Sequence, residues 1–410
     1  MKPVRFARSR ALGLLLRNVL FLSSMSVPMA IGSGQSMPDA VRYSDSGPEP
    51  MLEQAFRQIE HKRLDLALRQ IDALLEQWPN FRLAHLIRGD LLLARASALT
   101  TFGNVPNAPQ DRLADLRDEA IARIRAYRDK PPVDRVPRYL LQMAADQRHA
   151  VVVDARRSRL YLYENIDGKP RFVADWYVSH GRLGIEKMRE GDKKTPVGVY
   201  RVTGFLPPER LTDFYGAGAL PLNYPNAWDR KLGRNGHGIW LHGTPSDTFS
   251  RPPRASDGCV VLANPDFQAL HNYVQGASVP VIISEQVEWL TLDDWQAERT
   301  TFNRALEQWR SDWESRDSDR LLSHYSSEFR ADGKDYATFA KSKREVNASK
   351  QWVKVSISNV STFRNPGRDE MVVVTFDQDY RSNNLSNVMR KQQYWRKENG
   401  QWRIVFEGAA

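Results

Sequence analysis

The chain contains a single cysteine, Cys259, and a histidine, His242, stands seventeen residues before it. A thiol within reach of an imidazole is the minimum set for acyl transfer through a thioester, because histidine can take the proton from the sulfur that attacks a carbonyl. Gly258 lets the backbone approach closely, so neighbouring amides can face a developing oxyanion. A lone cysteine is more often a small buried apolar residue, and a lone histidine more often a structural one. The pair therefore indicates cysteine catalysis only where the fold brings the two together.

The elements around the two residues are expected to be short strands followed by a helix. The segment 240–243, Trp-Leu-His-Gly, ends a strand, and an apolar run follows Cys259. Asn264 is expected to be the N-cap of the next helix, with Pro265 at its first position. This helix is expected to run over 266–274 and to brace the cysteine segment against a sheet.

Three ordered motifs resemble the signature of the L,D-transpeptidase (YkuD-type) catalytic domain. They are Leu-His-Gly at 241–243, Ser-x-Gly-Cys-Val at 256–260, and a Thr-Pro-x-Gly turn within 191–200. The resemblance covers 148–285, about a third of the chain. It implies a β-rich fold around a catalytic cysteine and substrates that are the peptide stems of peptidoglycan. No metal and no organic cofactor is expected.

The resemblance also assigns roles by position. Cys259 is implied to be the nucleophile and His242 the general base, oriented by the backbone carbonyl of Gly243. Ser256 and Gly258 are expected to line the substrate-binding site.

Three further residues are substrate-binding candidates. Arg251 and Arg254 could hold a substrate carboxylate, with a solvated basic loop as the alternative, and His237 is a third candidate.

Two positions depart from the family pattern. Asp257 stands where the family usually has histidine, and Val261 where it usually has arginine. A carboxylate beside a thiol tends to raise the thiol pKa unless it points away.

The resemblance implies attack at the L-centre carbonyl of the third stem residue, release of D-alanine, and transfer of the acyl group to an amine. The order of domains also resembles the cell-shape L,D-carboxypeptidases, which hydrolyse the same bond with water. L,D-transpeptidase is the first hypothesis and L,D-carboxypeptidase the alternative, because water always competes for a thioester. A non-catalytic wall-binding scaffold is disfavoured, since both Cys259 and His242 are present.

The chain of 410 residues is expected to be multidomain. The fold class predicted is an N-terminal α-helical region, a central β-rich L,D-transpeptidase-like domain and a C-terminal α+β domain resembling a SnoaL-like cone. Two helices, expected to span about 51–78 and 81–99, resemble one tetratricopeptide-like hairpin, and a third, at about 111–128, closes the region. The region either mediates a homodimer or binds a protein partner, or it serves packing alone. The expected domains are 51–130, 148–285 and 295–410, the last with residues 295–330 helical before its strands.

The first residues predict export. Residues 1–32 combine five basic residues, no acid and a short apolar run, which is typical of a secretory signal peptide rather than an uncleaved anchor. Its removal, before a linker at 33–50, lowers the formal charge from +10 to +5 by five basic residues. We therefore expect a periplasmic protein with no stable membrane span after signal removal and no nucleic-acid partner. One cysteine excludes an intrachain disulfide and a multi-thiolate zinc site.

Overall fold

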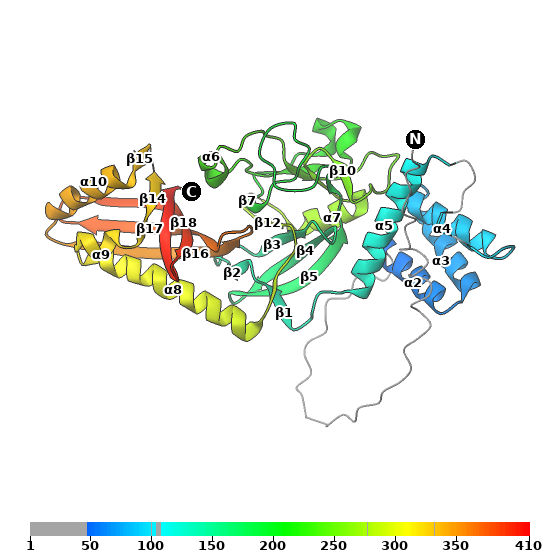
Figure 1. Cartoon of the computed structure of the whole chain (residues 1–410), viewed down its shortest axis with the longest axis horizontal. Helices are drawn as coiled ribbons and strands as arrows, with labels where there is room; N and C mark the ends of the chain where they lie inside the picture. Colours follow the sequence, from blue (N-terminus) through cyan, green and yellow to red (C-terminus); the bar gives the residue numbers. More distant parts are fainter. Residues whose placement is uncertain (1–46, 100, 104–107, 277, 332) are drawn as a thin grey trace, which may run out of the picture. The chain divides into compact units, whose positions relative to one another are not determined.

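The computed structural model describes residues 47–410 except 100, 104–107, 277 and 332 (Figure 1). The expected signal peptide at 1–32 and residues 33–46 of the expected linker lie outside the described residues. The chain forms two compact units, one made of residues up to Asp129 with Ser246–Pro253, and one made of Lys130–Pro245 with Arg254–Ala410.

The first unit is helical, as expected, but its helices are shorter than the sequence pattern suggests. The apolar pattern expected to form one helix up to residue 78 is divided at His61–Arg63, where Lys62 takes a left-handed conformation with φ 59°. The next helix ends at Leu93 rather than near residue 99. The helices are α2 (Pro48–Glu60), α3 (Leu64–Gln77), α4 (Arg82–Leu93) and α5 (Gln110–Arg128).

The segment Ser246–Pro253 belongs to this helical unit although it lies between the two sequence motifs of the candidate site. Phe249 is buried, and its ring centroid lies 4.1 Å from that of Phe81 and 6.3 Å from that of Trp78. The hydroxyl of Ser250 donates to the Glu119 carboxylate at 2.7 Å. The helices therefore hold part of the loop that joins His242 to Cys259.

The β-rich part of the second unit is built on a five-stranded sheet, in the order β5-β4-β3-β12-β7. Most of it is antiparallel, while β12 and β3 run parallel. Asp167 and Gly168, both with positive φ, form the hairpin turn between β4 and β5. The strands of this sheet are β3 (His149–Asp154), β4 (Arg159–Ile166), β5 (Lys169–Tyr177), β7 (Gly198–Arg201) and β12 (Pro280–Ser284).

Smaller sheets beside it carry the sequence motifs. One has the order β11-β9-β8, with β8 (Ala219–Pro221), β9 (Trp240–His242) and β11 (Val260–Val261). The other pairs β6 (His180–Gly181) with β10 (Arg254–Ser256). Helix α7 (Asn264–Tyr273) follows β11 and buries Phe267 and Leu270 in the core that the five-stranded sheet shares with β8, β9 and β11.

The C-terminal part is a seven-stranded sheet covered by helices, in the order β15-β14-β19-β18-β17-β16-β2. Residues 325–331, expected to be helical, form strand β14. Buried Tyr325 and Phe329 are four residues apart, a spacing that suits one face of a helix and also one face of a strand. The elements are β2 (Leu140–Gln142), α8 (Leu292–Glu314), α9 (Ser318–Leu322), β14 (Tyr325–Ala331), β15 (Lys334–Asp335), α10 (Tyr336–Ala348), β16 (Val353–Asn365), β17 (Met371–Ser382), β18 (Ser386–Glu398) and β19 (Gln401–Ala409).

The two large sheets of the second unit share a core. One face of the seven-stranded sheet packs on α8, through residues such as Trp309 and Trp395. Its other face contributes Val373 and Tyr394 to a second cluster with Val152 of the five-stranded sheet. Both faces of the C-terminal sheet are thus used for packing, which is why β-branched and aromatic residues occupy successive positions along β17.

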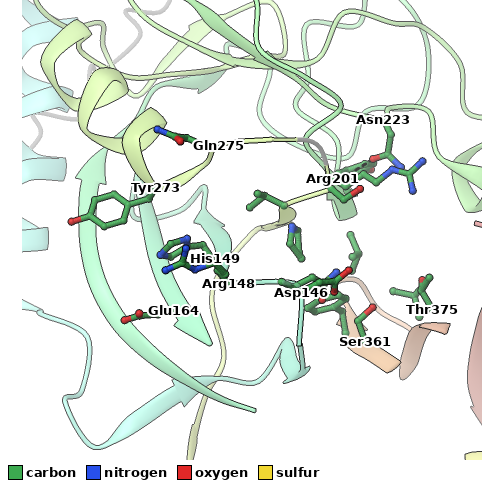
Figure 2. A pocket seen from close by; sticks show the side chains of 18 of the residues that line it. Asp146, Arg148, His149, Glu164, Arg201, Asn223, Tyr273, Gln275, Ser361 and Thr375 are labelled. Atoms are coloured by element: carbon green, nitrogen blue, oxygen red, sulfur yellow. Dashed lines mark hydrogen bonds between the residues drawn. The ribbon is translucent and has the colours of Figure 1, made fainter. Parts of the chain in front are cut away.

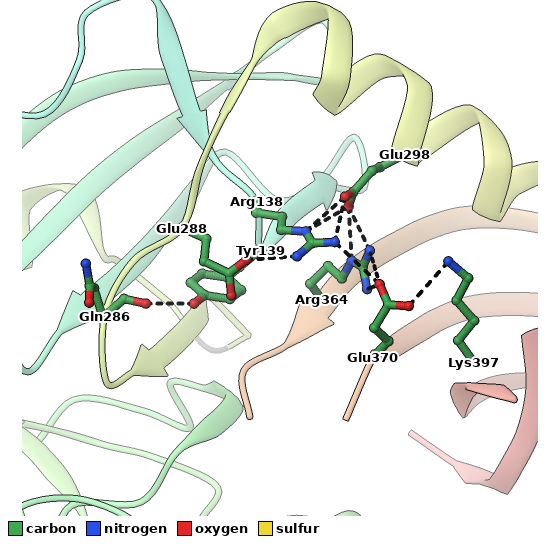
Figure 3. A network of polar contacts seen from close by, with 8 residues as sticks. All are labelled: Arg138, Tyr139, Gln286, Glu288, Glu298, Arg364, Glu370 and Lys397. Atoms are coloured by element: carbon green, nitrogen blue, oxygen red, sulfur yellow. Dashed lines mark hydrogen bonds and ion pairs between the residues drawn. The ribbon is translucent and has the colours of Figure 1, made fainter. Parts of the chain in front are cut away.

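A network of ion pairs supports this arrangement at the start of α8 (Figure 3). The Glu298 carboxylate accepts from Arg138 at 2.9 Å and from Arg364 of β16 at 3.0 Å. Glu370 lies 3.4 Å from Arg364 and 3.3 Å from Lys397. Since Arg138 lies two residues before β2, the network links the segment that leads into β2 to α8 and to β16.

Candidate active site

Of the two candidate catalytic residues, His242 ends strand β9 and Cys259 directly precedes the neighbouring strand β11. Strands β9 and β11 run parallel, with Val260 opposite Leu241 and Val261 opposite His242. Cys259 comes directly before β11, next to the strand that ends in His242. Since Val261 lies opposite His242, parallel pairing brings Cys259 to within two residues of the register partner of His242, although seventeen residues separate the two along the chain.

His242 is buried, with 1% of its surface exposed, and its ring orientation is fixed. Its Nδ1 lies 2.6 Å from the carbonyl oxygen of Gly243. A carbonyl can only accept, so Nδ1 carries the proton and Nε2 is the basic nitrogen. The rings of Phe214 and Tyr215 lie 5.9 and 5.1 Å from the imidazole, centroid to centroid. This tautomer can accept a proton at Nε2.

Cys259 is partly exposed, and its Sγ lies 3.3 Å from the carbonyl oxygen of Gly238. A thiol can donate to this carbonyl and a thiolate cannot, so the contact favours the neutral sulfur. Tyr215 lies close enough that its phenol pKa is raised, first by burial and second by the charge of Cys259. The sulfur therefore lies within hydrogen-bond distance of one carbonyl and near enough to the Tyr215 phenol for their charges to interact.

The turn that presents the cysteine is fixed by its own side chains. The hydroxyl of buried Ser256 donates to the carbonyl of Cys259 at 2.6 Å and accepts from the N–H of Gly258 at 3.1 Å. Gly258 has φ 133°, and a Cβ there would lie 2.8 Å from the carbonyl oxygen of Lys194. Ser256 thus holds the turn, and the predicted contact of Ser256 with substrate stays a prediction.

The Thr-Pro-x-Gly motif braces this turn from the other side. The hydroxyl of Thr195, which is fully buried, donates to the carbonyl of Gly258 at 2.9 Å and accepts from the N–H of Gly181 at 2.9 Å. This contact across 63 residues of sequence explains why the threonine motif occurs together with the cysteine motif. The sequence showed both motifs but no sign that they touch.

Asp192 organises the loop that leads into this motif. Its carboxylate accepts from Lys187 Nζ at 2.8 Å and from the backbone N–H groups of Met188 and Lys194 at 2.8 and 3.1 Å. Burial opposes the charged form, yet the hydrogen bond from Lys187 and those from the backbone lower the pKa from 3.8 to about 2.

Asp192→Asn is expected to lower the free energy of unfolding at pH 7 by about 2 kcal/mol, because hydrogen bonds to a charged carboxylate are lost. Since the folded pKa is below the unfolded one, this stabilisation is complete above about pH 4 and is lost as the pH falls towards 2. Urea unfolding curves at several pH values measure the difference, with exposed Asp134→Asn as control. A difference that stays the same at pH 2.5 and pH 7 would contradict the role of the charge.

Asn264 has a role that the sequence analysis missed. It is the first residue of α7, whose N-cap is Ala263, so the expected N-cap at Asn264 is wrong. Its Oδ1 accepts from the N–H groups of Ala217 and Thr244 at 2.9 and 3.1 Å, and its Nδ2 donates to the Thr244 carbonyl at 2.8 Å. A Cβ on Gly243 would lie 2.2 Å from that Oδ1, so a glycine follows His242 because the asparagine needs the space.

The other predicted substrate-binding residues are dispersed. His237 is 81% exposed, and its Nδ1 lies 3.4 Å from Glu190. Arg254 begins β10 opposite His180, whereas Arg251 belongs to the helical unit. The substrate contacts predicted for these three residues stay predictions.

The two departures from the family pattern have structural partners. Asp257 is 67% exposed and pairs with Arg182 at 3.0 Å, so its charge is partly compensated beside the cysteine. Val261 is buried and exchanges backbone hydrogen bonds with Ser179 at 2.9 and 2.8 Å. At this buried position a charged side chain would lose its hydration.

Comparison with known families agrees with this architecture. Residues 148–283 match the L,D-transpeptidase catalytic domain (YkuD), and residues 301–408 match the Cds6 C-terminal NTF2-like domain. The predicted combination of a YkuD-type catalytic domain and a C-terminal cone-like α+β domain is therefore confirmed.

Solved structures with both parts are also similar to this chain. Bd1075 of Bdellovibrio bacteriovorus is 26% identical with a TM-score of 0.60, over 68% of this chain and 98% of that chain. The helical cell shape determining protein Pgp2 of Campylobacter jejuni is 27% identical with a TM-score of 0.56, over 66% of this chain and 95% of that chain. No curated protein matches the chain.

Proposed function

We propose that this protein is a peptidoglycan-processing cysteine enzyme in which Cys259 attacks the L-centre carbonyl of the third residue of a stem peptide. The observation that supports the proposal is the parallel pairing of β9 with β11, in which Cys259 lies two residues before the register partner of His242, a buried imidazole whose Nε2 can accept a proton. The match of residues 148–283 to the L,D-transpeptidase catalytic domain supplies the substrate class.

The first half-reaction forms a thioester. Sγ of Cys259 attacks the carbonyl carbon while its proton passes to Nε2 of His242, and Gly243 holds the resulting imidazolium through Nδ1. The tetrahedral intermediate collapses, the C–N bond breaks, and the amine of D-alanine leaves with the proton from His242. The acyl group then remains on sulfur, and the imidazole is again neutral.

We infer that water is the acceptor in the second half-reaction, which makes the protein an L,D-carboxypeptidase that trims tetrapeptide stems to tripeptides. His242 takes a proton from water, the hydroxyl adds to the thioester, and the sulfur leaves and regains its proton. The likeness to the helical cell shape determining protein over both domains supports this choice. Transfer to an amine, the L,D-transpeptidase reaction, is the alternative and shares the first half-reaction.

The proposed place of action is the periplasm, because peptidoglycan lies outside the cytoplasm. Within the part of the chain that the structure describes, no helix has the length and apolar character needed to cross a bilayer. Association of two copies, or of a protein partner, through the N-terminal helices stays a prediction that gel filtration can test.

A muropeptide digest tests the function. Purified sacculi are treated with the protein, digested with a muramidase, and separated by mass. We expect tripeptide stems to replace tetrapeptides, with D-alanine released in equal amount. New dimers linked between two diamino acids would instead establish transfer, and unchanged stems would reject the proposed function.

A further inference from the structure

A cavity of about 750 Å³ lies in the second unit, apart from the residues of the candidate active site (Figure 2). Neither Cys259 nor His242 is among the described residues that line it. One wall is an end of the five-stranded sheet, and the other is the face of the C-terminal sheet that packs towards the catalytic domain. A space of this size suits a ligand of several residues rather than a single ion.

The register of the five-stranded sheet explains the first wall. Arg201, the last residue of β7, lies opposite Pro280, the first residue of β12, and β12 runs parallel to β3. The end of β7 and the starts of β12 and β3 therefore meet at one edge, just after Arg148. Figure 2 shows Arg148 and His149 on one side of this edge and Arg201 with Asn223 on another.

The second wall is a row of polar side chains on three adjacent strands. Ser361 of β16 lies opposite Thr375 of β17, which lies opposite Gln392 of β18. Since neighbours in register point to the same face of a sheet, the two hydroxyls and the amide line one surface. The Gln392 amide reaches the Thr375 hydroxyl at 3.5 Å, a long contact that leaves both groups able to bind a ligand.

Three arginines, Arg148, Arg201 and Arg390, and two carboxylates, Asp146 and Glu164, line the cavity, so its formal net charge is +1. The Asp146 carboxylate accepts from the Asn359 amide at 3.3 Å. The guanidinium groups of Arg148 and Arg201 are exposed and have no hydrogen-bond or ion-pair partner among the described residues. By contrast, Arg390 pairs with Asp377 at 3.0 Å and Glu164 with Arg171. Two arginines without a carboxylate partner in a concave site are suited to bind a carboxylate.

His149 completes the first wall as a neutral group. Its pKa is lowered, first by burial and also by the charge of Arg148, although Glu164 opposes the shift. Its ring meets that of Tyr273 edge to face at 5.5 Å. At neutral pH the imidazole therefore offers one donor and one acceptor beside the arginines.

We propose that this cavity binds a carboxylate-bearing segment of the peptidoglycan strand away from the bond that is cleaved. Arg148 and Arg201 each pair with a carboxylate of a stem peptide, while Ser361, Thr375 and Gln392 bind its amide or sugar hydroxyl groups. The identity of the polymer rests on the proposed function. The cavity would then hold the wall while another segment reaches Cys259.

Co-sedimentation with intact sacculi tests the proposal, using the full chain with Cys259→Ala so that the wall is not consumed. Adding Arg148→Ala with Arg201→Ala is expected to weaken binding about tenfold or more, because two charge-assisted contacts are lost. Arg304→Ala with Arg368→Ala removes two exposed arginines elsewhere and is the charge-matched control. Thr375→Trp, which fills the cavity without changing charge, is expected to weaken binding to a similar degree.

Sacculi whose carboxylates have been converted to neutral amides serve as the second probe, and they are expected to bind as weakly as the double variant binds untreated sacculi. The proposal is overturned if the double variant and Thr375→Trp bind like the parent, if the control pair weakens binding equally, or if the neutralised wall binds normally. Absence of binding by the parent also overturns it. Failure of the muropeptide digest alone would reject the proposed function and leave these binding results standing.

Discussion

Replacing Cys259 with alanine is expected to lower D-alanine release from tetrapeptide stems by about a thousandfold or more, because no other group can form the acyl intermediate. The chain has no second cysteine that could substitute. The side chain is only partly buried, so the free energy of unfolding is expected to change by less than about 1 kcal/mol. Mass spectrometry of released D-alanine and a urea unfolding curve measure the two quantities.

Cys259→Ser is the matched variant, because it keeps the size of the side chain and its hydrogen bond to Gly238 but replaces the sulfur by a weaker nucleophile. Its activity is expected to be nearly as low as that of the alanine variant. Alkylation of the single thiol by iodoacetamide, followed against pH in wild type and in His242→Gln, reports the influence of the imidazole on the sulfur. Products from Cys259→Ala that equal those of wild type would reject the thioester mechanism.

Asn264→Ala is expected to produce the second-largest loss, although Asn264 itself reacts with nothing. The substitution leaves the N–H groups of Ala217 and Thr244 and the carbonyl of Thr244 without their side-chain partner. Backbone groups left unsatisfied in a partly buried site cost about 1–3 kcal/mol each, so the unfolding free energy is expected to fall by about 3 kcal/mol. Because Thr244 follows Gly243, the bond that orients His242 is disturbed, and kcat is expected to fall by about a hundredfold.

Asn264→Asp separates these effects, because it keeps the acceptor for two N–H groups and loses only the donor to Thr244. We expect an intermediate stability and an intermediate kcat for this variant. Gln268→Ala, at an exposed position of the same helix, is the control and is expected to change neither quantity. If Asn264→Ala lowers stability but leaves kcat and its pH profile unchanged, Asn264 supports the fold without positioning His242.

The strands were the most predictable part of the fold. Alternating apolar residues and turns such as Asp167-Gly168 and Asn399-Gly400, all with positive φ, define hairpins through local geometry. The spacing of apolar residues predicted helices less reliably where the same spacing also suits one face of a strand. Tyr325 and Phe329 fit both a helix and a strand, and pairing of β14 with β19 decides in favour of the strand.

The position of the loop 246–253 could not have been predicted from its own sequence. Phe249 packs against Trp78 and Phe81 in the turn between α3 and α4, more than 160 residues earlier in the chain. Such a contact joins two segments of one compact unit that are far apart along the chain, and no local periodicity records it. The same is true of Thr195, whose partner Gly258 is 63 residues away.

The sequence by itself determined the residue types that can do chemistry, their order, and the strands and helix next to them. The single cysteine, the Leu-His-Gly strand end and the glycine before the cysteine are local features, because side-chain chemistry and backbone freedom belong to individual residues. Only the tertiary structure decided which of them meet. Three features join segments that are distant along the chain. They are the parallel pairing of β9 with β11, the hydrogen bonds between Asn264 and Thr244, and the cavity beside Arg148 and Arg201. They depend on how the sheets and loops pack, since the free energy of those contacts exists only in the folded chain.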